Sequence, residues 1–205
     1  MNFFRFLFLT ALITVFPMMV FSAEPAPPTQ VVQNLHASLL GVMKEAKKIG
    51  YQGRYKQLAP VIKETFYLPF IARIVVGRYW RTFDDEQKAK FLEIFEKLSI
   101  ATYAHRFDGY SGEQFRLVSE KESRRGRIIV NTLLIKPDGE KIELDYTLKR
   151  HKHRWRVINV TANGVSDLSL KRSDYTTFLK RNGFEALINK LDEKICSYSG
   201  KESSP

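Results

Sequence analysis

The chain has 205 residues, and 33 Lys and Arg against 22 Asp and Glu give it a formal net charge of +11. Hydrophobic residues make up 44% of the sequence, which is enough for one folded domain and excludes a disordered or low-complexity chain. The single cysteine, Cys196, excludes an internal disulfide framework and a zinc site built from several thiolates.

The N-terminal segment has the pattern of a secretory signal peptide. Arg5 gives a positive start, residues 6–21 carry no charge, and Val20-Phe21-Ser22 precedes a plausible cleavage point. We therefore expect a signal peptide at residues 1–22, a Pro-rich linker at 23–28, one domain at 29–196 and a flexible tail at 197–205. An uncleaved membrane anchor is the alternative. Export argues against nucleic acid as a partner and favours anionic membrane surfaces, although the basic charge is equally compatible with simple solubilisation.

Three helical regions are predicted in the first half of the domain. Apolar residues at helical spacing predict a helix over 29–49, capped by Thr29 and ended by Gly50. A short segment over 54–62 follows, and Pro60 is expected to break it. Pro69 opens another helix, which stops at Gly77.

A longer helix, and then a sheet, follow in the predicted order. The acidic run 84–86 begins a helix that extends to about residue 106, with large apolar side chains on one stripe. From residue 113 the apolar period becomes two, which predicts strands near 115–117, 128–135, 142–149 and 155–160. Pro137-Asp138-Gly139 supplies one turn, so the strands form an antiparallel meander.

Two final helices complete the prediction. Ser173 is expected to cap a helix that ends before Gly183, and a last helix reaches residue 195. Helices on both sides of a run of strands indicate an α+β fold with a curved antiparallel sheet of four or slightly more strands. A modest size favours a monomer.

No catalytic or metal-binding pattern emerges from the sequence. Ser166 follows Gly164-Val165, but the nucleophile-elbow pattern needs glycine where the chain has Leu168. His151 and His153 flank a lysine in a predicted turn, where solvated charges are the simpler interpretation. The expectation is a protein that is not an enzyme and has neither a cofactor nor a metal.

Large apolar side chains are the informative feature of this sequence. Periodicity shows that they face inward, but it leaves open whether they fill a core or line a lipid-binding pocket. The candidate pocket residues are Phe66, Ile71, Val75, Trp80, Phe91, Phe95, Leu98, Tyr103, Tyr146, Trp155, Tyr175 and Phe178.

A basic cluster brackets Trp80. Arg73, Arg78 and Arg81 are candidates for binding a lipid headgroup or docking a partner, because guanidinium groups pair with phosphate in a bidentate geometry. A solvated basic surface without such a role is the alternative.

Four segments resemble the toluene-tolerance, or MlaC, family of periplasmic lipid-binding proteins. They are FYLPFIARIVVGRYW at 66–80, QKAKFLEIFEKLSIATY at 87–103, WRVINV at 155–160 and NGVS at 163–166. Residues 107–115, 172–178 and 186–191 are most similar to its hopanoid-associated branch, HpnM. The chain departs from the family pattern at Tyr67 and Asn159, where the family often has Asp.

The resemblance implies a periplasmic carrier that moves phospholipid or hopanoid between the inner and outer membranes, with its bound lipid as cargo. Its expected partners are an inner-membrane ABC transporter of the Mla type or an RND-type transporter, and an outer-membrane lipoprotein complex. The second hypothesis is an exported basic interaction or assembly protein that docks on a membrane transporter complex without lipid cargo. A lipid hydrolase is the third.

Overall fold

The computed structural model describes residues 26–200. The predicted signal peptide, the first half of the predicted linker and the last five residues lie outside this range. Within the described residues, no helix is both long enough and apolar enough to cross a bilayer.

Helix α1, Pro28–Thr65, consists of two straight parts that meet at Gly50. It begins after Pro27 without a side-chain cap, so the predicted capping role of Thr29 is wrong. Gly50 has φ 61° and ψ −173°, a conformation open almost only to glycine, which explains why the predicted helix end falls there. Pro60 does not break the helix as predicted, because burial of Leu58 and Ile62 on either side holds the segment in place.

Helices α2, Leu68–Val76, and α3, Asp85–Arg106, are joined by the short 3₁₀ helix η1, Gly77–Arg81. The prediction that the acidic run begins α3 is confirmed. Asp84 accepts a 2.7 Å hydrogen bond from the Gln87 backbone N–H, and the Gln87 side chain accepts from the Asp84 backbone N–H at 3.2 Å. This reciprocal pair satisfies two amides that an uncapped helix would leave without partners.

The predicted antiparallel meander is confirmed as a sheet in the order β1-β2-β3-β4-β5. Its strands are Gln114–Ser123, Arg127–Ile135, Lys141–His151, Arg154–Ala162 and the two-residue Val165–Ser166. The predicted turn at 137–139 closes with a hydrogen bond of 3.0 Å from the Gly139 N–H to the Lys136 carbonyl. Register shifts in β1 and in β4 curve the sheet.

Helix α4, Asp167–Ser199, begins six residues before the predicted cap at Ser173. Ser166 is the actual cap, and its hydroxyl accepts from the Ser169 N–H at 3.2 Å. The predicted break at Gly183 is present as a kink with φ 81°. The helix also continues to Ser199, so the first residues of the predicted flexible tail are helical.

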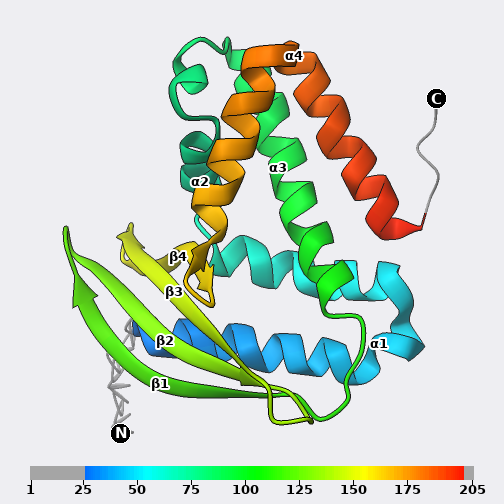
Figure 1. Cartoon of the computed structure of the whole chain (residues 1–205), viewed down its shortest axis with the longest axis vertical. Helices are drawn as coiled ribbons and strands as arrows, with labels where there is room; N and C mark the ends of the chain where they lie inside the picture. The colour runs from blue at the N-terminus through cyan, green and yellow to red at the C-terminus, as the bar shows by residue number, and fades with distance from the viewer. Residues whose placement is uncertain (1–25, 201–205) are drawn as a thin grey trace, which may run out of the picture.

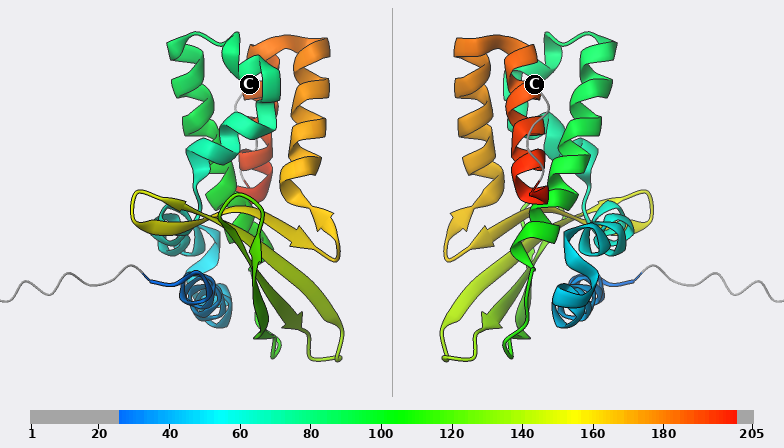
Figure 2. Two further views of the ribbon diagram at one scale, coloured as in Figure 1. Left: turned by 90° about the vertical axis from the view of Figure 1, so that its left-hand side faces the viewer. Right: turned by 90° about the vertical axis from the view of Figure 1, so that its right-hand side faces the viewer.

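The elements form a helical end and a sheet end (Figure 1). Helices α2, α3 and both parts of α4 stand side by side at one end, while α1 crosses the curved sheet at the other, as the views from both sides show (Figure 2). A single apolar core connects the two ends. The space where the bases of the helices meet the sheet is the place of the main cavity.

Candidate functional site

An apolar cavity of about 260 Å³ lies between the sheet and the bases of the helices. Helices α1 to α4 and strands β3 to β5 all contribute residues to its wall. It comprises Ile62, Phe66, Leu68, Ile71, Phe95, Ser99, Thr102, Tyr103, Arg106, Phe107, Leu144, Tyr146, Ile158, Asn159, Val160, Ala162, Val165, Asp167, Leu168, Leu170 and Lys171. Pockets for small ligands usually measure about 300–1,000 Å³, so this cavity is small for a lipid with two tails.

Aromatic side chains form part of the cavity wall. Phe66, at the end of α1, packs on Tyr103 of α3 with ring centroids 5.4 Å apart. The Tyr103 ring stacks on Phe107 at 5.7 Å, and burial raises the pKa of its phenol, so the hydroxyl stays neutral. These contacts give the cavity an aromatic wall suited to hydrocarbon.

Two large apolar side chains of the cavity wall are exposed, and they define what is called here the mouth of the cavity. Val165 on β5 is 52% exposed, and Leu170 in the first turn of α4 is 54% exposed. Arg106, at the last turn of α3, and Lys171 line the same space. The mouth therefore combines apolar surface with two cationic side chains and the Asp167 carboxylate, an arrangement that suits a molecule with hydrocarbon inside and a charged group outside.

Lys171 is held at this mouth by an ion pair with Asp167, one turn earlier in α4. Burial lowers the pKa of Lys171, and the Asp167 carboxylate opposes that effect. The ammonium group therefore has a partner when no ligand is present, and a phosphate group near it would compete with or join that pair.

Asn159 joins the cavity wall to the start of α4. Its side-chain oxygen accepts a 3.0 Å hydrogen bond from the Ser166 hydroxyl and a 3.1 Å hydrogen bond from the Leu168 N–H. The residue where this chain departs from the resembled pattern thus fixes the helix that carries the mouth. Asn159 is neutral, so it adds no negative charge beside the cavity.

The structure separates the twelve predicted pocket residues into two groups. Phe66, Ile71, Phe95, Tyr103 and Tyr146 line the cavity. The others lie elsewhere: Val75, Phe91, Leu98 and Tyr175 are buried in the core, and Trp80, Trp155 and Phe178 are partly buried against it.

Sequence reasoning missed most of the mouth. Arg106, Val165, Leu170 and Lys171 carry no apolar periodicity that sets them apart from surface residues. A signal did exist in the NGVS segment, because a strand end followed directly by a helix cap places its neighbours at the edge of the sheet.

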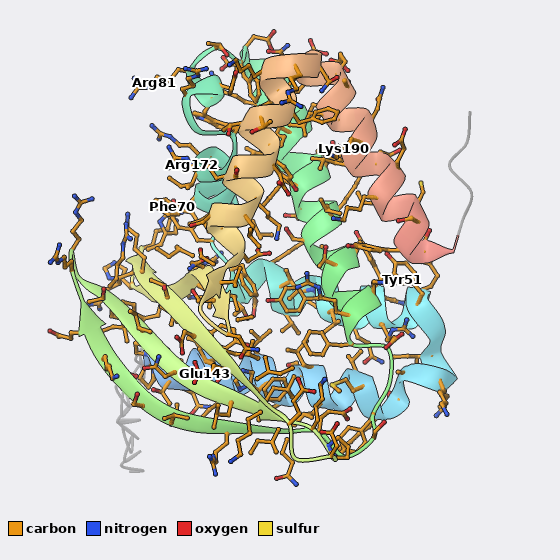
Figure 3. The ribbon with its side chains drawn as sticks, viewed as in Figure 1. Tyr51, Phe70, Arg81, Glu143, Arg172 and Lys190 are labelled. Carbon is orange, nitrogen blue, oxygen red and sulfur yellow. The ribbon has the colours of Figure 1, made fainter. Side chains whose placement is uncertain are left out.

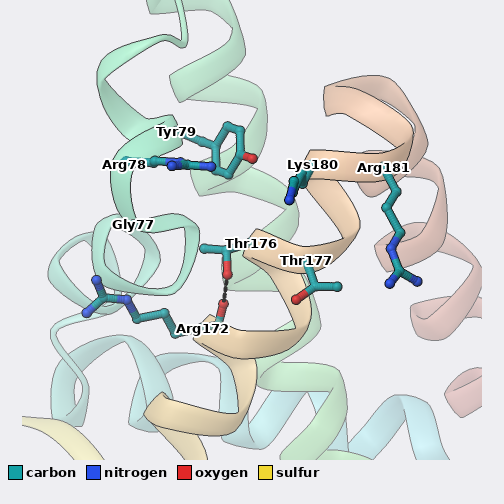
Figure 4. Close-up of a pocket in the computed structure, with 8 residues that line it drawn as sticks. All are labelled: Gly77, Arg78, Tyr79, Arg172, Thr176, Thr177, Lys180 and Arg181. Carbon is teal, nitrogen blue, oxygen red and sulfur yellow. Dashed lines mark hydrogen bonds between the residues drawn. The ribbon is translucent and has the colours of Figure 1, made fainter.

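Arg73, Arg78 and Arg81 do not line the cavity. They lie along a separate basic groove between α2–η1 and the first half of α4, where Arg81 and Arg172 point out from one side of the molecule (Figure 3). One hollow of this groove, about 510 Å³, is lined by Gly77, Arg78, Tyr79, Arg172, Thr176, Thr177, Lys180 and Arg181 (Figure 4). No acidic side chain lines it.

Helix geometry explains part of this basic groove. Arg73 lies in the last turn of α2, while Lys180 and Arg181 precede the kink of α4, so their charges complement the negative ends of helix dipoles. Gly77 allows the elements to approach, since a Cβ there would lie 3.3 Å from the Thr176 methyl group. The packing of these helices therefore forms the basic groove, which is distinct from the cavity.

The residues considered for catalysis have structural roles. Ser166 caps α4. His151 stacks on Tyr67 at 4.1 Å between ring centroids. Within residues 26–200, no three His, Cys, Asp or Glu side chains gather in a group that could hold a metal ion.

Comparison with known proteins assigns this chain to a family. The family model described as MlaC protein matches residues 33–193. A toluene tolerance protein of Pseudomonas putida is 26% identical over 198 residues, which cover 94% of this chain and 88% of that protein. The binding protein MlaC of an intermembrane phospholipid transport system in Haemophilus influenzae is 27% identical over 130 residues, 62% of this chain and 61% of that protein.

A solved structure shows the same fold. It is a phospholipid-binding protein from Ralstonia solanacearum in complex with a phospholipid, with a TM-score of 0.74 and 19% sequence identity. The match covers 84% of this chain and 99% of that one. The α+β fold expected from the sequence is thereby confirmed.

Proposed function

The chain belongs to the MlaC protein family, and on that premise we propose that it is a non-enzymatic lipid carrier of the periplasm. The hydrocarbon tails occupy the apolar cavity, and the headgroup stays at the mouth beside Arg106 and Lys171. The observation that carries the proposal is a cavity whose lining is mainly aromatic and aliphatic, with Arg106 and the Lys171–Asp167 ion pair as its charged members.

Elementary energetics supports placing the hydrocarbon tails inside the cavity and the headgroup at its mouth. Each buried methylene contributes about 0.8 kcal/mol, so the tails supply most of the binding free energy. A headgroup left at the mouth keeps its hydration and avoids the cost of burying charge. Binding of this kind distinguishes lipids mainly by chain volume, so we expect modest headgroup specificity.

Phospholipid is the first candidate for the cargo, because two of the relatives are described as phospholipid transport or phospholipid-binding proteins. Hopanoid is the second candidate, and it rests on the resemblance of residues 107–115, 172–178 and 186–191 to the hopanoid-associated HpnM branch. We propose transfer between the inner and outer membranes, with an Mla-type ABC or an RND-type transporter and an outer-membrane lipoprotein complex as partners.

The basic groove is the proposed docking surface for those partners. Within residues 26–200, Arg73, Arg78, Arg81 and Arg172 take part in none of the ion pairs, so their charges are available to an acidic surface. Long-range attraction of this kind raises the rate of encounter and weakens with salt.

Native mass spectrometry of the mature protein, purified without detergent from a hopanoid-producing host, tests the carrier proposal. A bound phospholipid or triterpenoid mass supports it and identifies the cargo. A protein that is empty and takes up neither lipid from vesicles contradicts it, and favours the second hypothesis, docking without cargo.

A variant whose cavity is filled by a larger side chain tests whether the lipid binds in that cavity. Ser99→Trp places an indole on the cavity wall, whereas Ala89→Trp adds the same bulk to the exposed side of the same helix. Overpacking costs about 1–3 kcal/mol, so we expect Ser99→Trp to lower lipid uptake by about tenfold or more and Ala89→Trp to leave it unchanged. Equal uptake by the two folded variants would place the lipid elsewhere.

A further inference from the structure

A second cavity, of about 220 Å³, lies between α1 and the outer strands of the sheet. Val32, His36, Leu40, Phe115, Leu117 and Thr132 are among its lining residues. Neither the sequence prediction nor the proposed function uses this space. The main cavity, at about 260 Å³, is small for a lipid with two tails, so an adjacent space would add room for the cargo.

Strand register places the two cavities side by side on one face of the sheet. Leu117 pairs with Thr132, Thr132 pairs with Leu144, and Leu144 pairs with Ala162 across four antiparallel strands. Residues directly opposite each other in such ladders point to the same face. This row begins in the second cavity, at Leu117 and Thr132, and ends in the main cavity, at Leu144 and Ala162.

Two side chains stand between the cavities. His36 lines the second cavity, Tyr146 lines the main one, and the His36 Nε2 atom lies 3.0 Å from the Tyr146 hydroxyl oxygen. Their rings meet edge to face at 5.3 Å, and His36 also stacks on Phe115 at 4.0 Å. A hydrogen-bonded pair braced by an aromatic ring therefore stands at the boundary between the two cavities.

We propose that the His36–Tyr146 pair is a removable partition, and that the cavity behind it is a second compartment for a hydrocarbon chain. This inference rests on the proposed function. With no chain present, the hydrogen bond keeps two buried polar groups satisfied and holds the wall closed. A chain long enough to reach the pair gains apolar contact on both sides when the two rings move apart, so the pair sets how much hydrocarbon the protein holds.

Competition among phosphatidylcholines of increasing acyl length, measured by native mass spectrometry after uptake from mixed vesicles, tests this partition. Tyr146→Phe removes the hydroxyl and keeps the ring, and His36→Leu replaces the imidazole by an apolar side chain. Each variant should increase uptake of the longest chains relative to the shortest by about five- to tenfold, the change that one ordinary net hydrogen bond corresponds to.

Two further variants separate the partition from other effects. Leu40→Trp fills the second compartment from α1, so combining it with His36→Leu should restore the wild-type length preference. Tyr175→Phe removes a phenol hydroxyl from a buried tyrosine that lines neither cavity, so it should leave the preference unchanged.

The outcomes distinguish this inference from the proposed function. If the wild type and all variants take up no lipid, the carrier proposal fails. If they take up lipid with one common length preference, the carrier proposal stands and the partition is wrong. A shift in Tyr175→Phe equal to that in Tyr146→Phe would also overturn the partition.

Discussion

Protonation of His36 should make the stability of the fold depend on pH. Its side chain is 6% exposed, and burial lowers its pKa from 6.5 to about 4. The imidazole is therefore neutral in the folded protein at a pH where the unfolded chain already binds a proton. The free energy of unfolding is then fully retained above pH 6.5 and falls as the pH drops toward about 4.

The size of the effect follows from the same two values. At about 1.4 kcal/mol for each pH unit, the interval between pH 6.5 and about 4 corresponds to a loss of about 3 kcal/mol. This is a large share of the roughly 5–15 kcal/mol that stabilises a typical domain. The cause is desolvation, since Phe115 stacks on the imidazole ring and Tyr146 packs against its edge.

Urea unfolding at a series of pH values, on the wild type and on His36→Leu, measures this contribution. Subtracting the two curves cancels the carboxylates that both proteins share, so the difference isolates the imidazole. The control is His153→Leu, which removes an exposed imidazole from the β3–β4 turn and should keep the wild-type dependence. Parallel curves for the wild type and His36→Leu between pH 4 and 6.5 would refute the argument.

Two further predictions concern the helices. Gly50→Ala should lower the free energy of unfolding by about 1–3 kcal/mol, because φ 61° with ψ −173° strains any residue with a Cβ; Gly41→Ala, in the same helix with open space around it, should instead raise it by about 0.5–1 kcal/mol. Asp84→Ala should cost about 1 kcal/mol in thermal or urea unfolding by removing the α3 cap. Equal effects at the two glycines, or an unchanged stability without Asp84, would contradict these assignments.

Much of the fold is readable from local chemistry. Period-two alternation, the turn at 137–139 and the capping box at Asp84 each act over a few residues, so the sequence predicts the meander and the start of α3. Errors arose where packing overrides such signals. Pro60 stays inside α1 because buried neighbours hold it, and Ser173 is not a cap because the Asn159 side chain and Ser166 begin α4 earlier.

The sequence likewise predicts only those features of the candidate site that a local pattern marks. Composition and periodicity identified large apolar side chains that face inward, and five of the predicted residues, Phe66, Ile71, Phe95, Tyr103 and Tyr146, do line the cavity. Periodicity describes one element at a time, whereas an empty space is a property of several elements together. Val75 and Phe91 have the same pattern and fill the core.

Residues that belong together only in space define the mouth and the wall between the cavities. Arg106 and Lys171 line the same cavity from two different helices. His36 and Tyr146 are 110 positions apart in the chain and share a hydrogen bond. Local sequence determines which face each side chain takes, but the distance between faces depends on how helices and sheet pack. Only the tertiary structure decided where apolar surface encloses space and where it fills it.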